Sequence, residues 1–467
     1  MKKIKANKLL VESSIYIVLS FVQKGLSFLL VPFYTHFLST EEFGLVNQII
    51  SLHSIYIVII TFSLNETIAK GIAQIENGEE DKVKMNIVIP NLIIVFFGVT
   101  TLFCFKWILY DSFIGQLDWK YTLCSIGIVA FTPVFFIFQK FIIMKRQPIF
   151  YAKMMISFVI IQIITSLIFI YLLELGSFGY ILSLSFTTII FGLFSYSRLL
   201  VIDKKLIDYT EIKTHLKYSL KLLPHGVSGW GINGFTNVAL GSIVSKSAVG
   251  IFNAVNVVGL LINVISRAIL DAFQPWIYEQ LSKNKDDTTT LKNIVRILSI
   301  LMVLMGVFII TFDEFILEIA LNKRYHSGII YAPFLVLNSV IVAVGSMTVY
   351  VIYYYDSKVK YVSISTIVGA ILNISIGYVL IKEFELIGAI GSLVFANFVM
   401  NIIKSIVSSR IIQSSYNLLE LWVIIYAVAI INYAWKDYAV ILNITSILYL
   451  LLRLYLIYKS MNKKNVQ

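Results

Sequence analysis

Long apolar segments separated by short polar breaks run through almost the whole chain, from Ser13 to Tyr458. A membrane-spanning helix needs about 20 mostly apolar residues at a rise of about 1.5 Å each. By this criterion the pattern predicts about fourteen spans. Their approximate positions are 13–36, 43–65, 86–105, 121–141, 150–173, 178–200, 216–242, 248–273, 293–312, 329–354, 359–381, 386–409, 418–434 and 438–458. We therefore predict an all-α polytopic membrane protein.

The composition supports a membrane environment. Hydrophobic residues make up 58% of the 467 residues and charged residues only 14%, and the mean hydropathy is +0.85. A soluble globule of this size needs more polar surface than that. A net charge of +12 would suggest an acidic partner in a soluble chain, but here the membrane topology explains it, and we expect no nucleic-acid partner.

The positive charges predict the orientation in the membrane, because loops retained in the cytoplasm collect Lys and Arg. With the N-terminus inside, 29 of the 38 Lys and Arg residues fall on the cytoplasmic side and seven in outer loops. The remaining two, Lys24 and Arg267, lie within spans. Residues 1–10 are basic and precede a long apolar segment without an obvious cleavage site, so we expect an uncleaved first span. Both termini are predicted to be cytoplasmic.

The chain also shows an internal duplication. Residues Phe37–Gly44 are echoed at Ile243–Gly250, displaced by 206 positions. Two further weak matches follow in the same order and at nearly the same offset, residues 79–88 with 285–295 and residues 176–186 with 386–395. Each copy holds six spans, and an even number relates the copies by an axis along the membrane normal.

The duplication predicts four regions. They are an N-terminal six-helix lobe (residues 1–200), a cytoplasmic linker (201–215), a C-terminal six-helix lobe (216–410), and two additional helices with a cytoplasmic tail (411–467).

Three stretches of sequence carry a family resemblance. They are the first-span pattern Leu26–Gly44, the seventh-span opening Tyr218–Pro224, and residues Ala248–Ala254. In these the chain resembles the polysaccharide flippases, for O-antigen or capsule repeat units, of the multidrug/oligosaccharidyl-lipid/polysaccharide exporter superfamily. The resemblance implies two pseudo-symmetric lobes around a V-shaped central cavity, with the first and seventh spans lining it and bending.

The resemblance further implies a function and a location. The protein would move undecaprenyl-diphosphate-linked oligosaccharide from the cytoplasmic to the outer leaflet of a bacterial inner membrane by alternating access. Partners implied are that lipid-linked sugar, the membrane lipids, H⁺ or Na⁺ as a counter-ion, and a polysaccharide polymerase with its chain-length machinery. No cofactor is expected.

Three alternatives remain open. A lipid II flippase of peptidoglycan synthesis also has fourteen spans. An ion-coupled multidrug exporter of the same superfamily typically has twelve. A polytopic polysaccharide polymerase would be an enzyme, but such chains carry a large outer loop, and here no predicted outer loop exceeds about 20 residues. The sequence also contains no Walker motif, metal-ligand spacing or nucleophile elbow, so we predict a protein that is not an enzyme.

Four residues are candidates for substrate binding: Lys24, Arg267, Trp230 and Asn233. A cation far from both span ends normally faces protein or a wet cavity, and it would suit a diphosphate. Arg267 and Asp271 are four residues apart, so an internal ion pair is the alternative. Trp230 aligns with Lys24 at the offset of 206 and would stack on sugar or simply pack, and Asn233 would bond to sugar or to a neighbouring helix.

Glu66, Asp271 and His225 are candidates for ion coupling. Acidic side chains and a histidine with an ordinary pKa of about 6.5 can carry protons or sodium. A hydrated helix end or a structural histidine is the alternative interpretation. Span seven also contains Pro224 and several glycines, which favour either bending or close helix packing.

Cys104 and Cys124 are the two cysteines, and they lie near the outer ends of spans three and four. They are interpreted as small buried hydrophobes, with a disulfide across that loop as the alternative.

Overall fold

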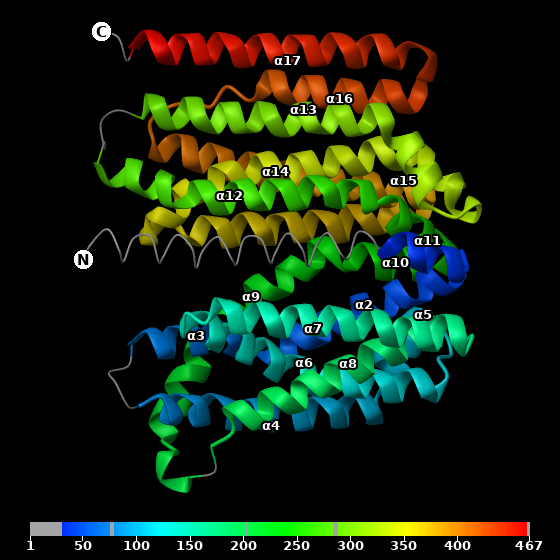
Figure 1. Ribbon diagram of the computed structural model, residues 1–467, viewed down its shortest axis with the longest axis vertical. Coiled ribbons are helices and arrows are strands. Elements are labelled where there is room, and N and C mark those ends of the chain that lie inside the picture. The colour runs from blue at the N-terminus through cyan, green and yellow to red at the C-terminus, as the bar shows by residue number, and fades with distance from the viewer. Residues whose placement is uncertain (1–29, 75–78, 202, 284–287, 465–467) are drawn as a thin grey trace. The chain divides into compact units, whose positions relative to one another are not determined.

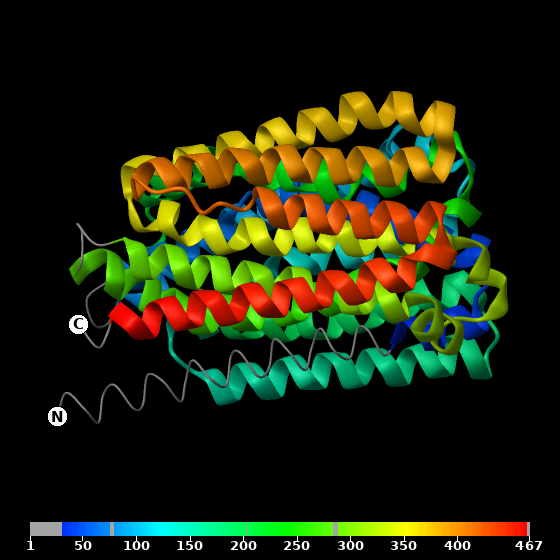
Figure 2. The ribbon, with the colours of Figure 1, turned by 90° about the horizontal axis from the view of Figure 1, so that it is seen from above.

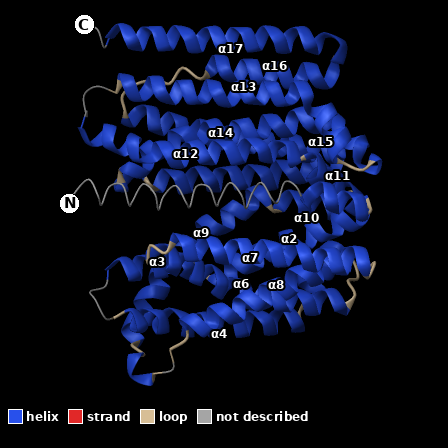
Figure 3. Ribbon diagram, viewed as in Figure 1, coloured by secondary structure: helices blue, strands red, loops and turns tan. Residues whose placement is uncertain are grey.

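The computed structural model describes residues 30–74, 79–201, 203–283 and 288–464, and within these ranges helices are the only regular elements (Figures 1 and 3). The predicted all-α class is confirmed for this part of the chain. Nine of the described helical segments are long and apolar enough to cross a membrane, or ten if a pair bent by 44° counts as one span. The protein is therefore a multi-pass membrane protein, and the total of fourteen spans stays a prediction.

The chain divides into two compact units. Among the described residues, unit 1 comprises 37–249 and unit 2 comprises 30–36 and 250–464. Figure 2 shows the helices within each unit running nearly parallel to one another. Unit 1 includes the helices at 209–243, which the sequence pattern places in the second lobe. The predicted lobe boundaries come from the sequence repeat, whereas the two units are defined by their compactness. The lobe boundaries therefore stay a prediction.

Unit 1 is built mainly from α2 to α10, and α6 lies against α2, α3, α4 and α8. Its buried side chains form two hydrophobic clusters, one around Phe135 and Phe138 and one around Ile49 and Val129. The elements are α2 (Thr40–Thr61), α3 (Leu64–Gln74), α4 (Glu80–Cys104), η1 (Trp107–Asp111), α5 (Ser112–Ile114), α6 (Trp119–Met144), α7 (Pro148–Ser166), η2 (Leu167–Leu172), α8 (Gly176–Leu199), η3 (Lys204–Leu206), α9 (Tyr209–Asn233) and α10 (Phe235–Ile243).

Unit 2 contains the later helices and is centred on α14, which lies against α12, α13, α15 and α16. The apolar window of the span containing α14 is 83% buried, more than that of any other candidate span among the described residues. The elements are α11 (Lys246–Val255, which crosses the boundary between the units), α12 (Val257–Lys283), α13 (Thr289–Ala320), η4 (Lys323–Tyr331), α14 (Ala332–Tyr354), η5 (Asp356–Lys358), α15 (Lys360–Ile411), α16 (Leu419–Ala434) and α17 (Lys436–Lys464).

The 52-residue α15 is interrupted at Glu385, whose backbone angles of φ 50° and ψ −124° are not helical. A non-glycine residue with positive φ breaks the helical course of the chain. The predicted spans at 359–381 and 386–409 lie on the two sides of this break.

The two copies of the repeated motif lie at the starts of two helices, α2 and α11. Ser39 caps α2: its Oγ accepts a hydrogen bond from Glu42 N at 3.2 Å, and Glu42 Oε2 accepts one from Ser39 N at 3.0 Å. Ser245, displaced by 206 positions, accepts a hydrogen bond from Ala248 N at 3.1 Å at the start of α11. Serine is favoured at this position because its oxygen satisfies a free backbone N–H group. The echo therefore preserves a capping function.

Candidate functional site

A cavity of about 400 Å³ lies within unit 1, between the end of α2, the start of α3, α6 and α9. Two predicted ion-coupling residues, Glu66 and His225, both line it although they are far apart in sequence. Its other lining residues are Ile57, Val58, Thr61, Ser63, Asn65, Phe136, Leu222 and Gly226. The cavity therefore combines an apolar wall with a small set of polar and titratable groups, as ligand sites commonly do.

A sharp turn between α2 and α3 forms one wall. Phe62 and Ser63 both adopt left-handed backbone conformations, with φ of 52° and 54°, which non-glycine residues rarely do. Phe62 N still donates to Val58 O, and the N–H groups of Glu66 and Thr67 donate to Ser63 O. The turn thereby presents Asn65 and Glu66 to the cavity.

The Glu66 carboxylate is engaged in an ion pair. Lys140 Nζ from α6 lies 2.9 Å from Glu66 Oε1, and Asn65 Nδ2 donates to the same oxygen at 3.2 Å. Both charged side chains are partly exposed, at 46% and 38%. In this conformation the cavity wall therefore holds a neutralised pair rather than a free anion.

Another wall is formed by α9 on both sides of Pro224, from Leu222 to Gly226. Gly226 lies here against α2, and a Cβ atom at this position would stand 2.9 Å from Val58 Cγ1. That is closer than real Cβ contacts, so the glycine permits α9 to approach α2 closely. His225 is exposed on this wall and takes part in an interaction of its own.

Two further contacts attach α9 to α3. The buried hydroxyls of Thr67 and Ser219 lie 2.5 Å apart. Lys70 Nζ lies 4.0 Å from the centre of the Tyr218 ring, in a cation–π contact. Together these two contacts hold α3 and α9, which both line the cavity, against each other.

A charged network that sequence reasoning missed holds the start of α9 against α4. Lys82 Nζ lies 2.6 Å from Glu211 and 3.3 Å from Asp208, and Asn86 Nδ2 donates to Glu211 at 2.8 Å. Asp208 also caps α9 by accepting bonds from Thr210 N and Glu211 N. The pKa of Asp208 is held below its ordinary value, most strongly by the Glu211 N–H group and then by Lys82 and the Thr210 N–H group. The Asp208-x-x-Glu211 spacing is typical of a helix start and was the available signal.

The predicted substrate-binding residues Trp230 and Asn233 lie near the end of α9. Trp230 Nε1 donates to Ser51 O at 2.7 Å, and its indole lies over Gly234, where a Cβ would stand 2.2 Å from Nε1. Asn233 is exposed and donates to Gly229 O at 3.0 Å. The helix breaks at Gly234, between α9 and α10, so the glycine-rich stretch does contain an interruption.

The remaining candidates lie elsewhere. Arg267 belongs to α12 of unit 2, where its side chain is exposed, has an interaction partner and acts electrostatically on Tyr353. Asp271 lies on the same helix, but its side chain is outside the description, and Lys24 falls outside the described residues. The structure thus brings Glu66 and His225 together, and the roles of all seven residues stay predictions. Both cysteines are free, Cys104 exposed and Cys124 buried.

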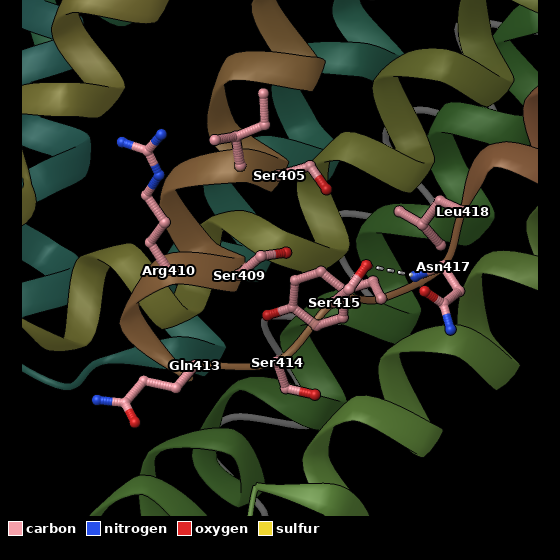
Figure 4. A pocket seen from close by; sticks show the side chains of 10 residues that line it. Ser405, Ser409, Arg410, Gln413, Ser414, Ser415, Asn417 and Leu418 are labelled. Atoms are coloured by element: carbon pink, nitrogen blue, oxygen red, sulfur yellow. Dashed lines mark hydrogen bonds between the residues drawn. The ribbon is translucent and has the colours of Figure 1, made fainter.

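A second cavity, of about 390 Å³, lies at the end of α15 in unit 2 and is lined mainly by hydroxyl and amide side chains. Figure 4 shows the Arg410 side chain directed away from Ser415 and Asn417. The backbone N–H group of Asn417 donates to Ser415 Oγ at 3.3 Å. Tyr416 is buried in its wall and bonds to Ser408 at 2.7 Å, and burial raises the pKa of Tyr416 to about 12. This cavity contains no convergent charges among the residues drawn.

The fold is similar to that of solved membrane transport proteins. One similar solved structure is an inward-facing multidrug resistance MATE family transporter of the MOP superfamily, with a TM-score of 0.67, 16% identity, and coverage of 84% of this chain and 94% of that one. Another is the lipid II flippase MurJ in an inward closed conformation, with a TM-score of 0.67, 14% identity and 98% coverage of both chains. A third is the Vibrio cholerae MATE transporter VcmN in the bent form, with a TM-score of 0.55, 14% identity, and coverage of 88% and 98%.

The family follows from the sequence itself. The sequence model of a family described as "Polysaccharide biosynthesis protein" matches residues 9–281, more than half of the 467 residues. The chain belongs to the polysaccharide biosynthesis protein family, which confirms the predicted family. No curated protein gives a significant match to the chain.

Proposed function

We propose that the protein is a flippase for lipid-linked oligosaccharides. Its cargo would be an undecaprenyl-diphosphate-linked repeat unit, moved from the cytoplasmic to the outer leaflet of a bacterial inner membrane by alternating access. The repeat unit would belong to O-antigen, capsule or a related surface polysaccharide. Both chain termini would lie in the cytoplasm, and the protein would work as a transporter and not as an enzyme.

The observation that carries this proposal is the combination of family and fold. The family match links the chain to polysaccharide biosynthesis, and the fold is similar to transporters over most of its length. A transporter in such a pathway needs a substrate that must cross the membrane, and a sugar assembled on a lipid diphosphate is one. Residues Lys24, Arg267, Trp230 and Asn233 would contact that cargo, with the two cations facing its diphosphate.

Ion coupling is the second element of the proposal. Glu66 and His225 would exchange H⁺ or Na⁺ in the cavity of unit 1 that they share, and Asp271 would do so in unit 2. A counter-ion that alternately neutralises and frees a carboxylate biases a two-state conformational equilibrium. The Glu66–Lys140 pair would open during this exchange.

Lipid II transport is the alternative, favoured by one observation. The likeness to the lipid II flippase extends over 98% of this chain and leaves about nine of the 467 residues unmatched. It therefore includes most of α16 and α17, whereas the multidrug transporter covers 84% of the chain.

Deletion of the gene in a strain that carries its own polysaccharide gene cluster tests the proposal. We expect loss of surface polysaccharide and build-up of the lipid-linked repeat unit on the cytoplasmic side, both restored by the wild-type chain. Unchanged surface polysaccharide would overturn the proposal. Rescue of cells depleted of their lipid II flippase, without effect on surface polysaccharide, would establish the alternative.

The substrate contacts are tested by the double substitution of Lys24→Gln with Arg267→Gln. We expect export to fall by on the order of tenfold or more. Lys120→Gln is the matched control, because it removes one positive charge from an exposed pair with Asp118. Equal export by the double variant and the control would exclude the cation assignment while leaving the flippase proposal intact.

A further inference from the structure

A buried carboxylate in unit 2 has one oxygen without a partner. Asp313 lies near the end of α13 and is only 7% exposed. Its Oδ1 accepts a hydrogen bond from Glu314 N at 2.7 Å. Its Oδ2 is buried and has no hydrogen-bond partner among the described residues. An ionised carboxylate in this situation is strongly unfavourable unless something neutralises it.

Asp313 also lines a cavity of about 270 Å³ formed by α13, η4, α14, α16 and α17. The titratable and charged groups that line it with Asp313 are Glu314, Glu318, His326, Tyr433 and Lys436. Three of these six groups are carboxyls, and such a wall attracts cations. The cavity therefore connects the buried carboxyl with a cation-attracting surface.

The two basic side chains that line the cavity are already engaged. Lys436 Nζ pairs with Glu314 Oε2 at 2.7 Å, and His326 Nε2 lies 3.1 Å from Leu321 O. The Asn432 amide, which also lines the cavity, exchanges two hydrogen bonds with Asn443 at 2.9 and 3.1 Å. None of these contacts neutralises Asp313 Oδ2.

We propose that Asp313 is a binding site for one monovalent cation, H⁺ or Na⁺, which reaches it through this cavity. The site is separate from the Glu66 and His225 cavity. It goes beyond the proposed function, because cation binding can be measured on the purified protein without any transported substrate. On the predicted topology α13 ends on the outer side, so the cation would enter from outside. Both ligands share the same chemistry, because each places one positive charge on the carboxyl.

The test compares the purified full-length protein in lipid nanodiscs with Asp313→Asn and Glu383→Gln. Glu383→Gln is the matched control, because Glu383 is an exposed carboxylate of the same unit that does not line this cavity. Thermal unfolding is measured at about pH 6 and about pH 8, in Na⁺ and in choline at equal ionic strength. A ligand that binds only the folded state raises the unfolding temperature.

Two results support the site and identify the cation. If the ligand is Na⁺, Na⁺ raises the unfolding temperature of the wild type and E383Q at about pH 8 but not that of D313N. If it is H⁺, acidification stabilises the wild type and E383Q, Na⁺ has no effect, and this part of the pH response is lost in D313N. Equal responses of the wild type and D313N to both pH and Na⁺ would overturn the proposal.

A second measurement covers the case in which D313N does not fold. Infrared spectra of the wild type and D313E report the carbonyl band of a protonated carboxyl. We expect a band that disappears with rising pH or added Na⁺ and that shifts in D313E. A wild-type spectrum without such a band, together with no response to Na⁺, would equally refute the site. Neither result depends on lipid-linked sugar, so failure here leaves the flippase proposal standing.

Discussion

The Glu66 carboxylate lies 2.9 Å from the Lys140 ammonium in the wall of a cavity that His225 also lines. The pair joins the start of α3 to α6, and both side chains remain partly exposed. An exposed pair of this kind contributes only about 0.2–1 kcal/mol to stability. Its value for transport would therefore lie in exchange of the partner, not in holding the fold.

Substitution of Glu66 by Gln separates the coupling and structural interpretations. We expect E66Q to unfold within about 1 kcal/mol of the wild type but to reduce export by on the order of tenfold, because the exchangeable charge is lost. Lys140→Gln is the matched control, because it breaks the same pair and leaves the carboxylate. Surface polysaccharide at equal protein expression is the measurement, and equal export by E66Q and K140Q would contradict a coupling role.

Trp230 is the subject of the second prediction, because its N–H group bonds to Ser51 O across the packing of α9 and α2. Trp230→Phe keeps an aromatic ring and loses that bond, so we expect a cost of about 0.5–1.5 kcal/mol. Trp230→Ala also removes the packing and should cost about 3–5 kcal/mol. Thermal unfolding in detergent or nanodiscs measures both.

Export distinguishes packing from sugar stacking at this position. Gly234→Ala is the companion variant, because its Cβ would displace the indole without removing it. Loss of export in W230A at a temperature where the protein is folded, with export kept in W230F, would support stacking. Export that simply follows stability through all three variants would show that the ring only packs.

Asp208 carries the third prediction, which concerns pH. Its pKa is held below the ordinary value by the Glu211 N–H group, Lys82 and the Thr210 N–H group. The folded state therefore binds fewer protons at this site than the unfolded state, and its stabilising contribution is present above the ordinary aspartate pKa of about 3.9. The contribution is lost as pH falls through the lowered folded value. We expect Asp208→Asn to unfold more easily than the wild type at neutral pH, with the difference shrinking in acid.

Lys205 provides a control for this pH effect, because it lies in the same linker, is exposed, and is not part of the network at α4. Unfolding of Lys205→Gln should follow the wild type from neutral to acidic pH. A constant difference between D208N and the wild type over that range would show that the carboxylate does not act through its charge.

The fourth prediction concerns Glu420, which joins α16 to α13 and α17 of unit 2. Arg453 Nη2 donates to both oxygens of its carboxylate, at 2.9 and 2.8 Å, and Arg296 of α13 contacts the same group. Removing the acid leaves two partly buried arginines without their shared partner, so we expect Glu420→Gln to cost about 1–3 kcal/mol. Hydrogen exchange should increase in α16 and α17 rather than in α2 to α8.

Glu318→Gln is the corresponding control, because its carboxylate is exposed on α13. We expect E318Q to leave exchange in α16 and α17 unchanged. If E420Q and E318Q show the same exchange, the three-residue network does not anchor the C-terminal helices.

The repeated motif shows what a local pattern can predict. Ser39 and Ser245 cap their helices at equivalent positions, because capping depends on residues within one turn of the helix start. Both copies of the motif lie at helix starts, those of α2 and α11. The all-helical class and the membrane environment follow in the same way from apolar runs about 20 residues long.

Asp313 shows where a local pattern fails. The ninth span was predicted at approximately residues 293–312, whereas α13 continues to Ala320. Contacts from η4, α14, α16 and α17 enclose the carboxyl. Burial by segments distant in sequence leaves no trace in the residues next to Asp313.

The sequence by itself determined the membrane environment of this protein, its helical class, its duplication and its family, because hydropathy, helix length and capping act over a few residues. It also identified Glu66 and His225 as separate candidates for ion coupling. Only the tertiary structure decided that they share a cavity, that Glu66 pairs with Lys140, and that Glu211 of the linker region bonds to Asn86. Such pairs depend on which helices pack together, and that is decided by the side-chain complementarity of whole helix faces.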